Sequence, residues 1–301
     1  MKNKQLALLA LIFVTLLAVV KGLEFLNRDQ GKPQVKKMYS LSADKIDQVT
    51  LSAPSESVTL QKINGSWQVT APVTGEANQT SATSLVTAIV NLTTDGTSST
   101  NAEKQDTYEV SDTAGTKVTV VGQGKTLATF YLGKTSSDYS HTYVRADGSN
   151  AIKTAKGSLK ATFVRTSTDW RNKVITSVAA DSIQSILVAQ QGSEPFTLLK
   201  DTASWILSPA TVTIDQTKTT AFVTALSAVN ASDFVADPDA LALDLASPAV
   251  RITLQTVADS SILDLYVKDG AYYAKTNASS QIFVIAQYSF DALNKKPADL
   301  I

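Results

Sequence analysis

The sequence predicts an α+β protein: an N-terminal transmembrane helix followed by two tandem repeats, each a mixed sheet packed with one main helix and short terminal helices. Three observations lead to this expectation. The chain opens on an apolar run. Two segments, NGSWQVTAPV at 64–73 and TASWILSPAT at 202–211, share one pattern around a Ser-Trp pair. Alternating and helix-spaced apolar residues recur in the same order in both halves.

The composition of the chain excludes several classes of function. A chain of 301 residues that is 44% hydrophobic and 18% charged is long and apolar enough for two domains. Lys plus Arg and Asp plus Glu number 27 each, so no overall field attracts nucleic acid. The absence of cysteine excludes disulfides, thiolate metal sites and cysteine nucleophiles. We therefore expect no cofactor, metal, nucleic-acid partner or small-molecule ligand.

The first residues resemble a membrane segment. Lys2 and Lys4 precede an apolar run over Leu6–Val20, which Lys21 closes. Such a helix of about 15 residues rises roughly 22 Å, short of the hydrocarbon core of about 30 Å, but the flanking lysines can reach outward. An uncleaved anchor is favoured; a signal peptide cut after Gly22 and a buried core helix stay open. The predicted anchor residues are Leu6, Leu9, Phe13, Leu17 and Val20.

The expected location is a cell membrane crossed once, with the N-terminus inside and the bulk of the chain extracytoplasmic. The segment after the anchor contains Gly31, Pro33 and several charges, which is typical of a tether. The predicted parts are an anchor or signal segment over 1–26, a tether over 27–43, and repeats over 44–176 and 177–301.

Each repeat begins with a strand and continues to a helix. ADKIDQVTLSA from Ala43 aligns with ADSIQSILVAQ from Ala180, and SATSLVTAIVNL aligns with TTAFVTALSAVN at the same offset. Polar residues over 78–81 and at Asp215 suit helix N-caps. Apolar residues at spacings of one, four and seven mark one helix face. They are Leu85, Val86, Ile89 and Leu92 in the first repeat, and Phe222, Val223, Leu226 and Val229 in the second.

The alignment continues through KVTV and RITL, TFYLGK and DLYVKD, and YVRA and YAKT. Each unit is therefore expected to contain three short strands, a helix, about four more strands and short helices. Trp67 and Trp205 are predicted to fill the space between sheet and helix, with a binding role as the alternative.

These elements resemble the DUF4340 family of bacterial proteins, in two divergent copies. The resemblance rests on the D-x-I opening strand, the W-x-[VL]-x-x-P element, the helix after it, a [YL]-x-[VL] element at 108–110 and 243–245, DWRNKVI from Asp169, and LNKKPADLI at the end. Glu109 and Asp244 stand where the family usually has Gly. The resemblance implies a membrane-anchored protein, with some members like accessory parts of gliding-type ABC export systems. It transfers no catalytic residue.

Two motifs resemble ligand-binding loops but lack residues that such loops need. TVVGQGKT at 119–126 ends like a P-loop, but Thr119 stands where glycine is required and an alternating stretch follows, so Gly122–Gly124 is predicted to be a hairpin turn. DPDALALD at 237–244 is acidic, but Leu241 and Leu243 interrupt the oxygen spacing that calcium needs.

His141 is the only histidine. Alternation in SDYSHTYVRA predicts that His141, Tyr143 and Arg145 share one strand face while Ser140 points to the other. With no G-x-S-x-G elbow, a Ser-His-Asp triad is not expected. A solvated or interface histidine is expected instead.

The function expected is that of a membrane-anchored, extracytoplasmic, non-enzymatic interaction or accessory protein, associated with an ABC-type export system. The hairpin at 136–148 is longer than its counterpart at 268–276, so its side chains are the candidate partner surface. They are Tyr139, His141, Tyr143 and Arg145. An ordinary solvated hairpin is one alternative. Another is a hydrolase or carbohydrate-binding protein that uses Asp138 or Asp237 in a cleft between the repeats.

Overall fold

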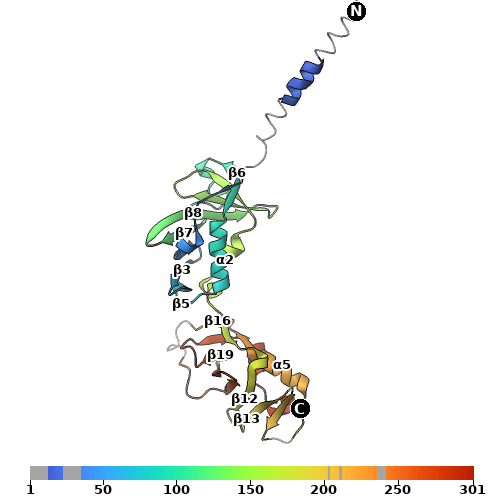
Figure 1. Ribbon diagram of the computed structural model, residues 1–301. Helices are drawn as coiled ribbons and strands as arrows, with labels where there is room; N and C mark the ends of the chain where they lie inside the picture. The colour runs from blue at the N-terminus through green and yellow to red at the C-terminus, as the bar shows by residue number, and fades with distance from the viewer. Residues whose placement is uncertain (1–12, 23–34, 203, 210–211, 236–241) are drawn as a thin grey trace, which may run out of the picture. The chain divides into compact units, whose positions relative to one another are not determined.

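The computed structural model describes residues 13–22, 35–202, 204–209, 212–235 and 242–301. The chain is mostly β, with three antiparallel sheets and few helices (Figure 1). The predicted α+β class with mixed sheets is therefore wrong. Short turns join most consecutive strands, and such turns can connect only antiparallel neighbours.

The prediction of an N-terminal transmembrane helix is also wrong. In the part of the chain that the structure describes, no helix is both long and apolar enough to cross a membrane. A helix over 13–22 exposes Phe13, Leu17 and Val20. The predicted anchor residues Leu6 and Leu9 lie outside the described residues.

The chain divides into two compact units. Unit 1 comprises Met1–Pro72 and Thr80–Thr166, and unit 2 comprises Val73–Gln79 and Ser167–Ile301. The division falls earlier than the predicted boundary after residue 176. A short segment from the first half of the sequence also belongs to unit 2, which no pattern in the sequence indicated.

Unit 1 is built on nine antiparallel strands in the order β1-β6-β10-β9-β8-β7-β2-β3-β4, and the short strand β5 belongs to the Val73–Gln79 segment of unit 2. Alternation places every second side chain of β7 in the core. Lys36–Lys37, within the predicted tether, form β1. The strands are β1 (Lys36–Lys37), β2 (Gln48–Ser52), β3 (Ser57–Ile63), β4 (Ser66–Ala71), β5 (Gly75–Glu76), β6 (Thr93–Ser99), β7 (Thr116–Gly122), β8 (Lys125–Thr135), β9 (His141–Ala146) and β10 (Ile152–Lys156).

One main helix, α2 (Gln79–Val90), packs in unit 1 (Figure 1). Its buried side chains include Leu85, Val86 and Ile89, and Leu92 after it is also buried, which confirms the predicted face. The short helix α3 (Lys160–Phe163) follows the strands of unit 1, and α4 (Ser167–Trp170) belongs to unit 2.

Unit 2 contains an eight-stranded antiparallel sheet with the order β14-β13-β12-β17-β18-β19-β20-β16, and a two-stranded sheet of β11 and β15. In unit 1 the order β4-β3-β2-β7-β8-β9-β10-β6 has the same connectivity. The strands are β11 (Val174–Ser177), β12 (Ile183–Gln190), β13 (Phe196–Asp201), β14 (Ser204–Ser208), β15 (Ala228–Asn230), β16 (Asp233–Phe234), β17 (Val250–Thr256), β18 (Ser260–Lys268), β19 (Ala271–Thr276) and β20 (Phe283–Ile285).

The main helix of unit 2, α5 (Gln216–Ser227), begins at the predicted cap. The Asp215 side chain accepts hydrogen bonds from the backbone N–H groups of Thr217 and Lys218. Phe222, Val223 and Leu226 are buried, which confirms the predicted face. A second helix, α7 (Gln287–Leu293), contributes Phe290 and Leu293 to the same core.

Two local predictions are also confirmed. Trp67 and Trp205 are core residues, with 7% and 8% of their surface exposed. The predicted turn forms between β7 and β8, where Gln123 and Gly124 adopt φ values of 51° and 72°. The positive φ at Gly124 suits glycine, and a strand follows in place of the helix that a phosphate-binding loop requires.

Candidate functional site

The hairpin predicted as a partner surface presents fewer side chains than the sequence suggested. Tyr139 is 76% exposed, in the turn between β8 and β9. Tyr143 is half-buried and packs edge-on against Tyr108, with the ring centroids 4.5 Å apart. Arg145 is buried, so its charge serves the fold. Tyr139 and the partly exposed His141 are what this surface offers a partner.

Arg145 holds a loop against the sheet. Its Nε donates to the carbonyl of Val110 at 2.7 Å, and its Nη2 donates to Asp112 at 2.8 Å. The guanidinium carbon lies 4.1 Å from the centre of the Tyr131 ring. Three groups distant in sequence from Arg145 thus meet at one buried cation, an arrangement that fixes the segment before β7.

His141 lies at the centre of a hydrogen-bonded chain. Its Nε2 is 2.8 Å from Asp95 Oδ2, and its Nδ1 is 2.6 Å from Ser140 Oγ. Thr154 donates to the other oxygen of Asp95 at 2.8 Å. The Ser140 hydroxyl also donates to Asp138 Oδ2 at 2.6 Å. The prediction that Ser140 points away from His141 is wrong, because β9 begins at His141 and Ser140 belongs to the turn.

The Ser140 hydroxyl is shared between two partners, His141 and Asp138. A hydroxyl has one proton to donate, and Ser140 donates it to Asp138. His141 Nδ1 lies 2.6 Å from the same hydroxyl, and its Nε2 faces the carboxylate of Asp95. A general base needs a free ring lone pair directed at the nucleophile. The arrangement ties β6, β9 and the turn together as a hydrogen-bonded link.

Both carboxyls of this link favour their ionised form. Hydrogen bonds from Ser136 and Ser140 hold the pKa of Asp138 well below its usual range. Burial alone would raise the pKa of Asp95, but hydrogen bonds from Thr154 and His141 outweigh it and hold this pKa below its ordinary value of 3.8. The other acid predicted for a cleft, Asp237, lies outside the described residues.

We expect Asp95→Asn to lower the free energy of unfolding by about 1–2 kcal/mol at neutral pH, because a charged hydrogen bond is lost. The folded-state pKa of Asp95 is lowered, so its contribution is complete above the unfolded value of about 3.8 and is lost as pH falls through the folded value. Urea unfolding at neutral and acidic pH tests this, with the exposed Asp106→Asn as control. A difference from wild type that persists unchanged in acid would contradict it.

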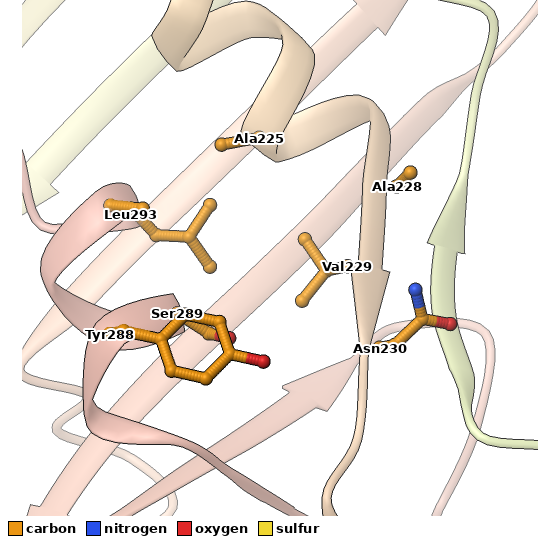
Figure 2. Close-up of a pocket in the computed structure, with 8 residues that line it drawn as sticks. Ala225, Ala228, Val229, Asn230, Tyr288, Ser289 and Leu293 are labelled. Carbon is orange, nitrogen blue, oxygen red and sulfur yellow. The ribbon is translucent and has the colours of Figure 1, made fainter.

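Unit 2 contains a groove that sequence reasoning missed. Figure 2 shows it between α5, β15 and α7, with Val229 and Leu293 facing one another and the Tyr288 ring beside them. Val229 and Leu293 are 3% and 1% exposed, whereas Tyr288 is 79% exposed. The cavity has a volume of about 220 Å³, and no charged side chain lines it. Its lining is Ala225, Ala228, Val229, Asn230, Tyr288, Ser289, Ala292 and Leu293.

Small residues create this groove. Ala225 and Ala292 stand on facing helices, where longer side chains would close the space. The signal in the sequence is weak, because alanine is common in any helix. The exposed aromatic residue beside a buried apolar floor distinguishes the groove from ordinary surface.

The comparison with protein families matches residues 67–248 to the family described as Domain of unknown function (DUF4340). The match covers more than half of the chain. The chain belongs to the DUF4340 family. It is a single match, which begins at Trp67 in β4 and ends before β17. No curated protein and no solved structure matches the chain.

The [YL]-x-[VL] elements of this DUF4340 chain cover the second face of each sheet. In unit 1, Tyr108 and Val110 pack with Tyr131 and Ile152. In unit 2, Leu243 packs with a second small cluster that contains Tyr266. Glu109 adopts a φ of 55°, the left-handed conformation that favours glycine. This conformation explains why glycine is the residue expected at this position. The Glu109 carboxylate lies 2.8 Å from Lys160 Nζ.

Proposed function

We propose that this chain is a non-enzymatic binding protein that docks an apolar side chain of a polypeptide partner in the groove between α5 and α7. The groove carries the proposal. Its floor is apolar, its lining has no charged side chain, and Tyr288 stands exposed at its edge. Exposed tyrosines beside apolar pockets are typical of the residues that dominate binding energy at interfaces. A charged ligand would find no counter-ion in this groove.

We expect a photo-crosslinking residue placed at position 288 to capture one partner in the cells from which the gene comes. The same residue at Tyr139, which is equally exposed on a hairpin, is the control. Ala225→Glu places a carboxylate in the groove and should abolish the crosslink, since burying an unpaired charge is costly. Ala221→Glu, one turn earlier on α5 and exposed, should leave it unchanged.

Two results would count against docking in the groove. One is a crosslink at 288 that survives Ala225→Glu in a chain with unchanged melting temperature. The other is equal capture of the same partner from position 139, which would favour the hairpin surface of Tyr139 and His141 instead.

A hydrolase is the second candidate, and one observation favours it. Ser140, His141 and Asp95 form a continuous hydrogen-bonded series, as nucleophile, base and acid do in serine hydrolases. Covalent labelling of Ser140 by a fluorophosphonate, lost in His141→Ala, would favour this function. An absence of labelling at Ser140 would exclude a serine hydrolase.

We also infer that the two units are copies of one DUF4340-like repeat. The matching strand order and the Trp residues of β4 and β14 support this inference. Experimental structures of both units should then superpose strand for strand, and a different order of connections would contradict it. The extracytoplasmic location, a bacterial origin and an ABC-type exporter as partner stay predictions, and the identity of the crosslinked partner tests the last.

A further inference from the structure

A buried arginine in unit 2 stands outside both sites described above. Arg171 follows α4 in the DWRNKVI segment and is 9% exposed. Its guanidinium carbon lies 3.6 Å from the centre of the Phe234 ring. Gly75 approaches the guanidinium so closely that a Cβ there would lie 2.7 Å from Arg171 Nε. The guanidinium is therefore held between a ring and a backbone that only glycine allows this near.

Backbone pairing within unit 2 fixes this position. Ala77 and Arg171 form an isolated antiparallel bridge. On either side, the N–H of Asn78 donates to Trp170 O and the N–H of Asn172 donates to Glu76 O, both at 2.8 Å. The segment over 73–79 therefore acts as a short strand beside Arg171, which explains why it belongs to unit 2.

The charge of Arg171 is poorly compensated. Among the described residues, its guanidinium makes one hydrogen bond, from Nη2 to Gln281 Oε1 at 2.6 Å, and its Nε is buried with no acceptor. No carboxylate in that part of the chain lies within 4.0 Å of it. Burial lowers the pKa of Arg171, with the negative charge of Asp233 acting in the opposite direction. Asp233 Oδ1 accepts instead from Thr168 and from the N–H of Phe234.

An uncompensated buried cation is unusual. Arginine cannot release its proton at ordinary pH, so it cannot escape the cost of burial as lysine does. Arg171 lines a cavity of about 430 Å³, which is within the usual range for small-molecule sites. Hydroxyl and amide groups share the lining, and they can donate hydrogen bonds to the same ligand. They belong to Thr74, Asn172, Thr276, Ser279, Ser280 and Gln281.

We propose that this cavity binds the oxyanion of a small molecule, a carboxylate or a phosphate group, with Arg171 as its counter-ion. A planar guanidinium matches the geometry of both groups, and the surrounding hydroxyls supply further donors. This site shares no lining residue with the groove between α5 and α7. A failure of either proposal therefore leaves the other unaffected.

The cavity provides two variants with opposite expected effects. Arg171→Lys keeps the charge but removes the planar donor pair, and should weaken oxyanion binding by about tenfold or more. Glu76 also lines the cavity, and its side chain is exposed. Its charge repels an anion, so Glu76→Gln should tighten binding by about two- to threefold. An exposed side chain is replaced in Glu76→Gln, so this variant folds even if Arg171→Lys does not.

The test follows the side-chain amide signals of Gln281, which lines the cavity beside Arg171 and is kept in both variants, in the full-length, nitrogen-15-labelled chain by NMR. Sodium acetate and sodium phosphate are titrated separately, with sodium chloride at matched ionic strength as control. We expect one or both anions to shift these signals with saturation, and the variants to change the midpoint in the stated directions. Saturation by acetate alone identifies a carboxylate ligand, and saturation by phosphate alone identifies a phosphate ligand.

Three results would overturn the proposal. They are no shift beyond that with chloride, unsaturated shifts with both anions, and a midpoint in Glu76→Gln equal to or weaker than that of wild type.

Discussion

Replacing Trp205 with alanine is expected to lower the free energy of unfolding of unit 2 by about 3–5 kcal/mol, the usual cost of removing a buried aromatic side chain. Trp205 belongs to the main core cluster of that unit, which also contains Phe222 of α5. Its backbone is tied to the same helix, because Gln216 accepts from the N–H of Trp205 and donates to its carbonyl, both at 2.9 Å. The cavity left behind therefore faces a helix with little freedom to move into it.

Calorimetry of the intact chain measures this loss. Tyr288→Ala is the control, since an exposed tyrosine of the same unit should change stability by no more than about 0.5 kcal/mol. Trp67→Ala should have a similar effect on unit 1, where that tryptophan is equally buried. A loss of less than about 1 kcal/mol for Trp205→Ala would show that the core closes around the missing ring.

Arg145→Ala is expected to destabilise unit 1 on the order of 3 kcal/mol, because a buried, charged donor is lost and the Val110 carbonyl keeps no replacement. The matched control is Arg251→Ala. Arg251 makes two hydrogen bonds to Asp264, but its side chain is 48% exposed. Its removal should cost no more than about 1 kcal/mol. Urea unfolding of both variants measures the difference, and equal losses would contradict the role given to burial.

Arg145 also shows where sequence reasoning about a surface fails. The predicted partner surface assumed that a longer hairpin exposes its polar residues. The structure covers Arg145 with the segment that contains Val110 and Asp112, more than thirty positions earlier in the chain. No local pattern indicates such a cover, because the contact depends on which strands become neighbours.

What the sequence could predict was local. The helix faces of α2 and α5, the Asp215 cap and the hairpin at Gly124 follow from periodicity and turn chemistry within a few residues. The link between His141 and Asp95 joins positions 46 residues apart, and it exists because β6, β10 and β9 are neighbours in the sheet.

The segment Val73–Gln79 has a consequence for how the protein is made. A ribosome releases this segment well before Ser167, the first residue of the rest of unit 2. The segment therefore cannot make its contacts with Trp170 and Asn172 while the remainder of unit 1 is synthesised. Unit 2 can complete its fold only after both pieces have emerged, so the order of synthesis makes the second unit depend on the first having left this segment accessible.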